Sequence, residues 1–122
     1  MRKRKVVPHR GDIFLVSFDP TVGSEIKKTR PALVIQNNIA NTHSPLTIVA
    51  AITSLGEKRR LYPTEVGIKA GRNGLDNDSV VLLNQIRTVD KQRLIQKIGK
   101  VHPNTLQEIN SALEISLGLI EL

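Results

Sequence analysis

The chain has 122 residues, a net charge of +7, 39% hydrophobic residues and no cysteine. This length is enough for one domain with a modest core, and the hydrophobic fraction is typical of a globular rather than a disordered chain. The lack of cysteine excludes disulfides, thiolate metal sites and cysteine nucleophiles. The positive charge favours a polyanionic partner, which composition alone leaves open as a nucleic acid or an acidic protein.

Other compositional features exclude several classes of protein. Aromatic residues make up only 2% of the chain, which argues against an RNA-recognition sheet that stacks bases on surface aromatics. The three histidines are far apart and show no metal-ligand spacing, so we expect no metal or cofactor. Apolar stretches such as Leu46–Ile52 are too short to cross a membrane. A soluble, cytoplasmic protein is therefore expected.

The chain begins with a basic arm over residues 1–9, which carries the cations of Arg2–Lys5. The arm is either a solvated tail or a nucleic-acid contact. Residues 10–122 are expected to form a single domain. Apolar runs and turn residues predict six strands, over Ile13–Phe18, Ala32–Gln36, Leu46–Thr53, Thr64–Ile68, Ser79–Ile86 and Ile98–Val101.

Between and after these strands the sequence predicts loops and late helices. A polar connection over Asn37–Pro45 has room for one helical turn, and Asp90 is placed to cap a short helix that runs to about Gln96. Pro103 suits the first position of a final helix, whose apolar stripe is Leu106, Ile109, Leu113, Leu117 and Ile120. This order predicts an α+β fold with a small, mainly antiparallel, barrel-like sheet and a C-terminal helix.

Three local features could carry chemistry. Arg30 ends a polar loop, and the following Pro31 fixes the backbone, so its guanidinium is either a phosphate clamp or part of a surface ion pair. Thr53 is the last residue of the most apolar predicted strand. It is either a catalytic group placed at a strand end or a residue that simply terminates the strand. The cations of Lys58–Arg60 and of Lys69 and Arg72 are either solvated or in contact with phosphates.

Taken together, these segments resemble the MazF/PemK family of toxin endoribonucleases. The resemblance covers nearly the whole chain from Arg10, and the matching stretches follow the family's order. Those stretches are RGDIFLVSFDPTVGSE, TRPALVIQNN, LTIVAAIT, DSVVLLNQIRTVDKQRL and NSALEISLGLI.

The resemblance implies a barrel-like fold shared with a gyrase poison, a two-fold homodimer and an RNA groove at the dimer interface. It also implies sequence-specific, metal-independent cleavage of single-stranded RNA, with mRNA as the cellular substrate, so that the toxin inhibits translation. A cognate antitoxin protein is the expected second partner. Two alternatives remain for comparison, namely a gyrase-poisoning toxin on the same fold and a basic RNA-binding module without catalysis.

The resemblance also implies roles for particular residues. Arg30 and Thr53 correspond to the family's catalytic pair. The ribose 2′-hydroxyl is then the nucleophile and yields a 2′,3′-cyclic phosphate and a 5′-hydroxyl. Because an arginine has a pKa above about 12, Arg30 suits charge stabilisation rather than general base catalysis, which leaves Glu25 as the candidate for proton transfer. The expected RNA contacts are Ser24, Lys28, Lys58, Arg59 and Gln85.

The sequence also departs from the family pattern. Ile26 stands where a glutamine is common, and Lys28 stands where a glycine often gives the loop freedom. The turn at Leu61–Pro63 is one residue longer than in close relatives, and the Arg2–Lys5 arm is an addition. These changes leave the catalytic pair intact, but they bear on loop mobility and on the RNA sequence that is cut.

Overall fold

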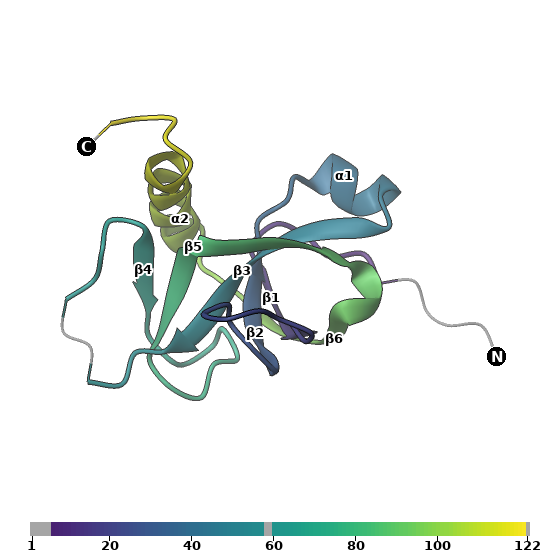
Figure 1. Cartoon of the computed structure of the whole chain (residues 1–122), viewed down its shortest axis with the longest axis horizontal. Helices are drawn as coiled ribbons and strands as arrows, with labels where there is room; N and C mark the ends of the chain where they lie inside the picture. The colour runs from purple at the N-terminus through teal and green to yellow at the C-terminus, as the bar shows by residue number, and fades with distance from the viewer. Residues whose placement is uncertain (1–5, 58–59, 122) are drawn as a thin grey trace.

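A computed structural model describes residues 6–57 and 60–121 of the chain. Its six strands form one antiparallel sheet in the order β4-β5-β3-β2-β1-β6 (Figure 1). The strands are β1 (Asp12–Ser17), β2 (Thr29–Val34), β3 (Leu46–Ser54), β4 (Glu65–Ile68), β5 (Ser79–Asp90) and β6 (Leu94–Lys100). The helices are α1 (Asn38–His43), the 3₁₀-helix η1 (Lys91–Arg93) and α2 (Pro103–Ser116). The predicted α+β fold, with an antiparallel sheet and a C-terminal helix, is confirmed.

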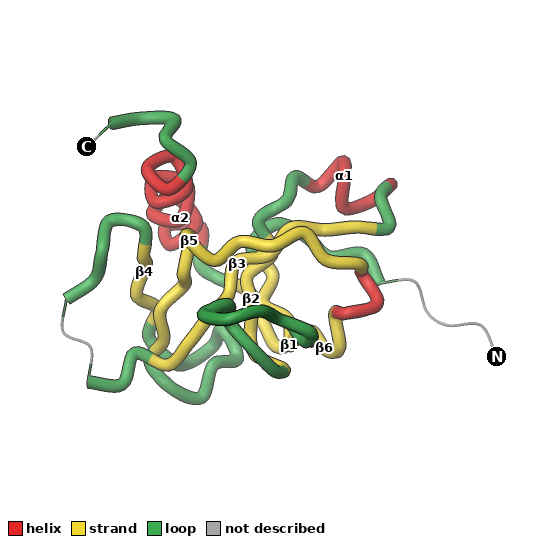
Figure 2. The backbone as a smooth tube through the Cα atoms, viewed as in Figure 1, coloured by secondary structure: helices red, strands yellow, loops and turns green. Residues whose placement is uncertain are grey.

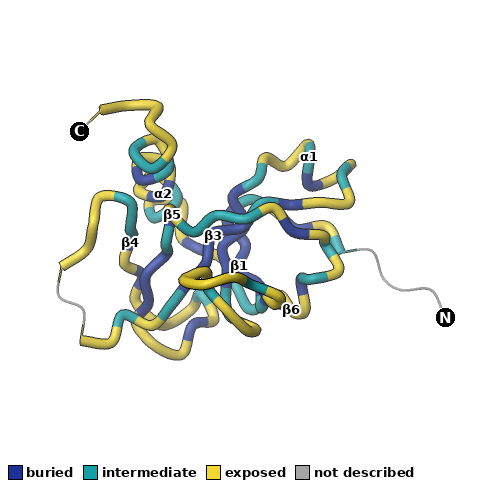
Figure 3. Tube along the Cα trace, viewed as in Figure 1, coloured by how far each residue is buried: buried dark blue, intermediate teal, exposed yellow. Residues whose placement is uncertain are grey.

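The central strand β3 is covered on both faces, as its continuous apolar run predicts. Ala50 and Ile52 belong to one core cluster, which α2 covers with Ile109 and other residues. Val49 and Ala51 alternate with them and belong to a second cluster on the opposite face. Figure 3 shows this buried interior along the middle of the sheet, with exposed loops around it. The two clusters explain why β3 has no polar face.

Backbone contact between two glycines joins the two edges of the sheet. Gly74, in the loop after β4, lies against Ile98 of β6, and a Cβ built on Gly74 would be 1.9 Å from the Ile98 carbonyl oxygen. A Cβ on Gly99 would lie 2.0 Å from the carbonyl oxygen of Asn73. Leu75 in the same loop is buried in the first core cluster. The β4–β5 loop therefore closes the side of the fold that strand pairing leaves open.

Replacing Gly99 with alanine is expected to destabilise the protein by about 3 kcal/mol, because the new methyl group meets backbone atoms that have no space to move. The measurement is the midpoint of urea unfolding. Gly67→Ala is the matched control, since its Cβ would meet only the end of the Leu61 side chain, at 3.3 Å. Equal midpoints for the two variants would contradict this account of loop closure.

The predicted helix after Asp90 is shorter than the sequence indicates. Asp90 does act as the N-cap, and its carboxylate accepts a hydrogen bond from the Gln92 N–H at 2.8 Å. However, η1 ends at Arg93, and the expected helical residues Leu94–Gln96 form strand β6 instead. Leu94 is 5% exposed and pairs with Val16 of β1, so sheet pairing and burial override the local helical signal.

The predicted apolar stripe of the last helix extends beyond the observed helix. Ile109 is buried, whereas Leu117 is 55% exposed and Ile120 is 46% exposed. Gly118 adopts φ +71°, its N–H bonds to the Ile115 carbonyl, and the Leu119 N–H bonds to the Glu114 carbonyl at 2.8 Å. This glycine cap ends α2 at Ser116, and the last two residues of the stripe lie outside the core.

Other strand boundaries also differ from expectation, and β3 ends at Ser54 rather than at Thr53. Strand β2 begins at Thr29, because its first residues pair with β1, and β5 continues to Asp90 along β3. The helical turn allowed between the second and third strands is present as α1. Its Asn41 is fully buried and accepts a hydrogen bond from the Thr47 hydroxyl at 2.7 Å. Within the part of the chain that the structure describes, no helix is long and apolar enough to span a membrane.

Candidate active site

Arg30 and Thr53 lie at the same end of two neighbouring strands. Strands β2 and β3 pair Ala32 with Ala51, and Val34 with Val49. Arg30 and Thr53 each lie two residues beyond the last of these pairs, at the same end of the two strands. Because side chains alternate along a strand, both follow the face that carries the second core cluster. Two residues that are 23 positions apart in the sequence therefore share one edge of one sheet face.

The Arg30 guanidinium is held on one side only. Its Nε donates a hydrogen bond to the Lys27 carbonyl oxygen at 2.9 Å, and the side chain is partly exposed. Among residues 6–57 and 60–121, no carboxylate forms an ion pair with this guanidinium. With Nε bonded to the Lys27 carbonyl, the two terminal nitrogens form a fork that matches two phosphate oxygens.

The segment between β1 and β2, residues 19–28, folds over this part of the sheet (Figure 2). Ile26 packs against the second core cluster. Lys28 is the only described residue other than glycine with a positive φ, at 67°, a conformation that costs a side-chain-bearing residue about 1 kcal/mol. Its N–H bonds to the Asp19 carboxylate at 3.1 Å, and its carbonyl accepts from the Phe18 N–H. This positive φ explains why the position of Lys28 suits a glycine.

Glu25 and Gln85 meet at a cavity of about 190 Å³ beside the site. Its wall includes Arg87 and Ala51, which lies two residues before Thr53 on the same face of β3. Glu25 is exposed, and its Oε1 accepts a hydrogen bond from the Val22 N–H at 3.1 Å. Gln85 uses its own Oε1 to accept from the Ile26 N–H at 3.1 Å. The neighbouring Ser24 is also exposed.

Two arginines that the sequence did not single out hold the start of this segment. Arg87 donates from Nη1 to the carbonyl oxygen of Phe18. Arg93 donates from Nη1 to the Ser17 carbonyl at 3.1 Å and to the Asp19 carbonyl. Nothing in the spacing of these residues along the chain indicates such contacts, because the partners are 69 to 76 positions apart. Only the pairing of β5 and β6 with the rest of the sheet brings them there.

The remaining predicted residues either lie outside the described part of the chain or line a separate hollow. Lys58 and Arg59 lie outside the described residues, as do the cations of Arg2–Lys5. Lys69 and Arg72 line a separate hollow beside the start of α2. Among the ranges that the structure describes, no three histidine, aspartate or glutamate side chains are grouped as metal ligands would be.

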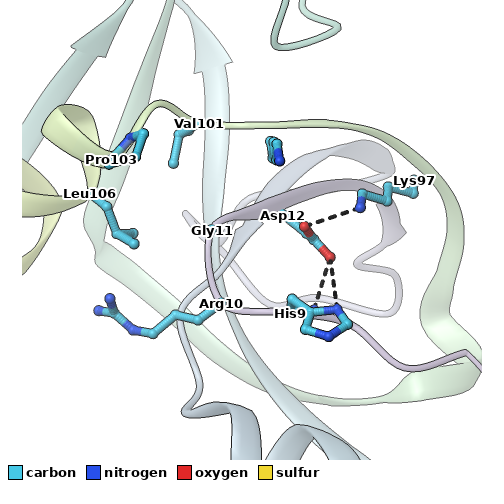
Figure 4. A pocket seen from close by; sticks show the side chains of 9 residues that line it. His9, Arg10, Gly11, Asp12, Lys97, Val101, Pro103 and Leu106 are labelled. Carbon is cyan, nitrogen blue, oxygen red and sulfur yellow. Dashed lines mark hydrogen bonds and ion pairs between the residues drawn. The ribbon is translucent and has the colours of Figure 1, made fainter.

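A further hollow, where β1 begins, is lined by residues that bind one another or the neighbouring backbone (Figure 4). Asp12 is 4% exposed, and it binds the Lys97 ammonium at 3.3 Å and accepts from the His9 N–H at 2.9 Å. Arg10 donates to the Ile35 carbonyl at 2.9 Å and to the Asn110 side chain at 2.7 Å. Burial lowers the pKa of its guanidinium. With Gly11 at φ +98°, Arg10–Asp12 forms the turn into the first strand.

Comparison with known proteins identifies the family of this chain. Residues 9–117 match the family described as "PemK-like, MazF-like toxin of type II toxin-antitoxin system". The chain belongs to this family. In sequence it is 49% identical to endoribonuclease EndoA of Bacillus subtilis. The 116 aligned residues cover 95% of this chain and 99% of that protein. It is 46% identical to endoribonuclease MazF of Staphylococcus saprophyticus, over 90% and 91% of the two chains.

Solved structures of MazF-like toxins share the fold. The crystal structure of MazF from Deinococcus radiodurans has a TM-score of 0.79 and 28% identity, over 93% of this chain and 99% of that one. A mycobacterial endoribonuclease in complex with its cognate antitoxin has a TM-score of 0.76 and 28% identity, over 94% and 99% of the two chains. The MazF-like family predicted from the ordered motifs is thereby confirmed.

Proposed function

We propose that the protein is a toxin endoribonuclease that cleaves single-stranded RNA at Arg30 and Thr53. The observation that carries the proposal is their placement. A chain 49% identical to an endoribonuclease has Arg30, which forms no ion pair with a carboxylate of the described residues, and Thr53, next to the last residue of β3, at one end of one sheet face. Charge that grows on the phosphate oxygens in the transition state is stabilised by a fixed guanidinium. The Thr53 hydroxyl donates a hydrogen bond to the same phosphate or orients the 2′-hydroxyl.

The rest of the proposed reaction follows from RNA chemistry. The ribose 2′-hydroxyl attacks the adjacent phosphate, the bond to the 5′-oxygen breaks, and the products are a 2′,3′-cyclic phosphate and a 5′-hydroxyl. No metal ion takes part. Glu25 is the proposed proton acceptor, because its carboxylate lines the cavity beside the site. Ser24, Lys28, Lys58, Arg59 and Gln85 are the proposed RNA contacts.

The proposed setting is cytoplasmic, with the toxin as a homodimer whose interface carries the RNA groove. Loss of mRNA then inhibits translation until a cognate antitoxin binds. Related toxins named as complexes with an antitoxin, from mycobacteria and from Deinococcus radiodurans, support the antitoxin partner. The gyrase-poison alternative is weaker, because both similar curated proteins are named endoribonucleases and a gyrase poison has no use for Arg30 and Thr53.

Incubation of the purified protein with a long defined RNA tests the proposal. We expect a small set of discrete fragments that recur at one short sequence, because a sequence-specific endonuclease cuts at few positions. Salt-dependent RNA binding without fragments would instead indicate the non-catalytic binding module. Supercoiling by gyrase should be unaffected at the same protein concentration, and its inhibition would favour the gyrase-poison alternative.

A further inference from the structure

A bulge in β5 carries Gln85 out of the regular ladder. Strand β3 pairs Ala51 with Leu82, and the next residue, Ala50, pairs with Ile86. Residues 83–85 of β5 therefore have no counterpart on β3. Bulges of this kind bend a strand and redirect its side chains, and they are frequent next to active sites. The bulge gives Gln85 a direction that regular pairing would not allow.

The redirected side chain holds the segment 19–28. The Oε1 of Gln85 accepts the Ile26 N–H at 3.1 Å, close to the end of the segment that leads to Arg30. Two residues further along β5, Arg87 binds the Phe18 carbonyl at the start of the same segment. Strand β5 thus holds the segment near both of its ends.

Apart from the hydrogen bonds that Arg93 and Lys28 make with Asp19 near its ends, the segment has few other contacts that would keep it in place. Most of its residues are exposed, and Ile26 is its one side chain that packs against the core. Exposed segments with few buried apolar contacts open readily. One side-chain hydrogen bond to the backbone then has a measurable influence on how often the segment is closed.

We propose that Gln85 is a positioning residue, whose side-chain oxygen holds the segment 19–28 closed and so keeps Glu25 at the cavity beside Thr53. This role differs from contact with RNA, because it uses the acceptor oxygen toward the protein itself. It also sets a condition on RNA recognition. A base that donates a hydrogen bond to the same oxygen has to displace the Ile26 N–H and release the segment. Only the expected effect of Gln85 on RNA cleavage rests on the proposed ribonuclease function.

Two substitutions of Gln85 separate the roles of its oxygen and its NH₂ group. Gln85→Met has a similar size and no strong acceptor. Gln85→Glu keeps an acceptor for the Ile26 N–H but loses the NH₂ group, the part of the side chain that the Ile26 contact leaves for a base, and Arg87 at the same cavity offsets the added charge. Gln96→Met on β6 is the matched control, since Gln96 is exposed, pairs with Leu15 and does not line the cavity.

The first measurement is hydrogen exchange of the Ile26 amide in the protein without RNA. We expect exchange about fivefold faster in Gln85→Met, and wild-type exchange in Gln85→Glu and in the control. Unchanged exchange in Gln85→Met would overturn the proposal. Because no RNA is present, this result stands even if the protein cuts no RNA.

The second measurement is kcat and KM on single-stranded RNA. We expect Gln85→Met to lose most of kcat, and Gln85→Glu to keep most of it, because the segment stays closed. Equal loss of kcat in both variants, with the Ile26 amide still protected in Gln85→Glu, would assign Gln85 to base recognition and would also overturn the proposal.

Discussion

Replacing Arg30 with alanine is expected to lower RNA cleavage about a thousand-fold while the protein stays folded. In the proposed mechanism this guanidinium stabilises the charge that develops on the scissile phosphate. Within residues 6–57 and 60–121 its side chain makes a single hydrogen bond, to the Lys27 carbonyl, so the free energy of unfolding should fall by only about 1 kcal/mol. The measurements are the single-turnover cleavage rate and the urea midpoint.

Two further variants separate position from charge. Arg72→Ala removes the same charge from an exposed site in a different hollow, and it should cut RNA at nearly the wild-type rate. Arg30→Lys keeps the charge but loses the two-pronged fork, and we expect it to remain far below wild type. A similar loss in Arg30→Ala and Arg72→Ala would mean that Arg30 acts only through net charge, against the proposed mechanism.

A single 2′-deoxy nucleotide on the 5′ side of the scissile phosphate is expected to abolish cleavage of an RNA oligonucleotide. The 2′-hydroxyl is the proposed nucleophile, so its removal leaves nothing to attack the phosphate, whereas backbone contacts remain. Binding should therefore change little, and the oligonucleotide should act as a competitive inhibitor. The measurements are the cleavage rate and the Kd of the substituted strand.

The control for this experiment is the same substitution one nucleotide further along the strand, which should be cut normally. Cleavage of the first strand at the unsubstituted rate would require water as the nucleophile. The proposed roles of Arg30, Thr53 and Glu25 would then have to be assigned again.

The sheet was predictable from the sequence because its strands are strongly apolar. The side chains of Leu46–Thr53 contribute to the core clusters on both faces of the sheet, and such a continuous apolar run predicts a buried strand. The errors lie where tertiary contacts outweigh local preference. Leu94 follows a well-formed helix cap but pairs with β1 and is buried, and Gly118 ends α2 before the apolar stripe does. Each error moves an element boundary and leaves the order of the elements intact.

The candidate site was predictable only in part. The family resemblance indicated Arg30 and Thr53, and their common edge follows from the register of β2 and β3. The hold of β5 on the segment 19–28 was not predictable, because it depends on a bulge and on contacts between residues up to 69 positions apart. The sequence showed Lys28 where the family often has a glycine. Only the structure shows that the position has a positive φ, a conformation that favours glycine.

The central claim is that this protein cuts RNA by itself, through the 2′-hydroxyl and without a metal ion. Its most direct test is to incubate the purified protein with a long defined RNA in excess EDTA and to determine the position and chemistry of the new 5′ ends. We predict cuts at one short recurring sequence, with 5′-hydroxyl ends that a kinase labels without prior phosphatase treatment. Intact RNA in EDTA, or 5′-phosphate ends, would contradict the claim.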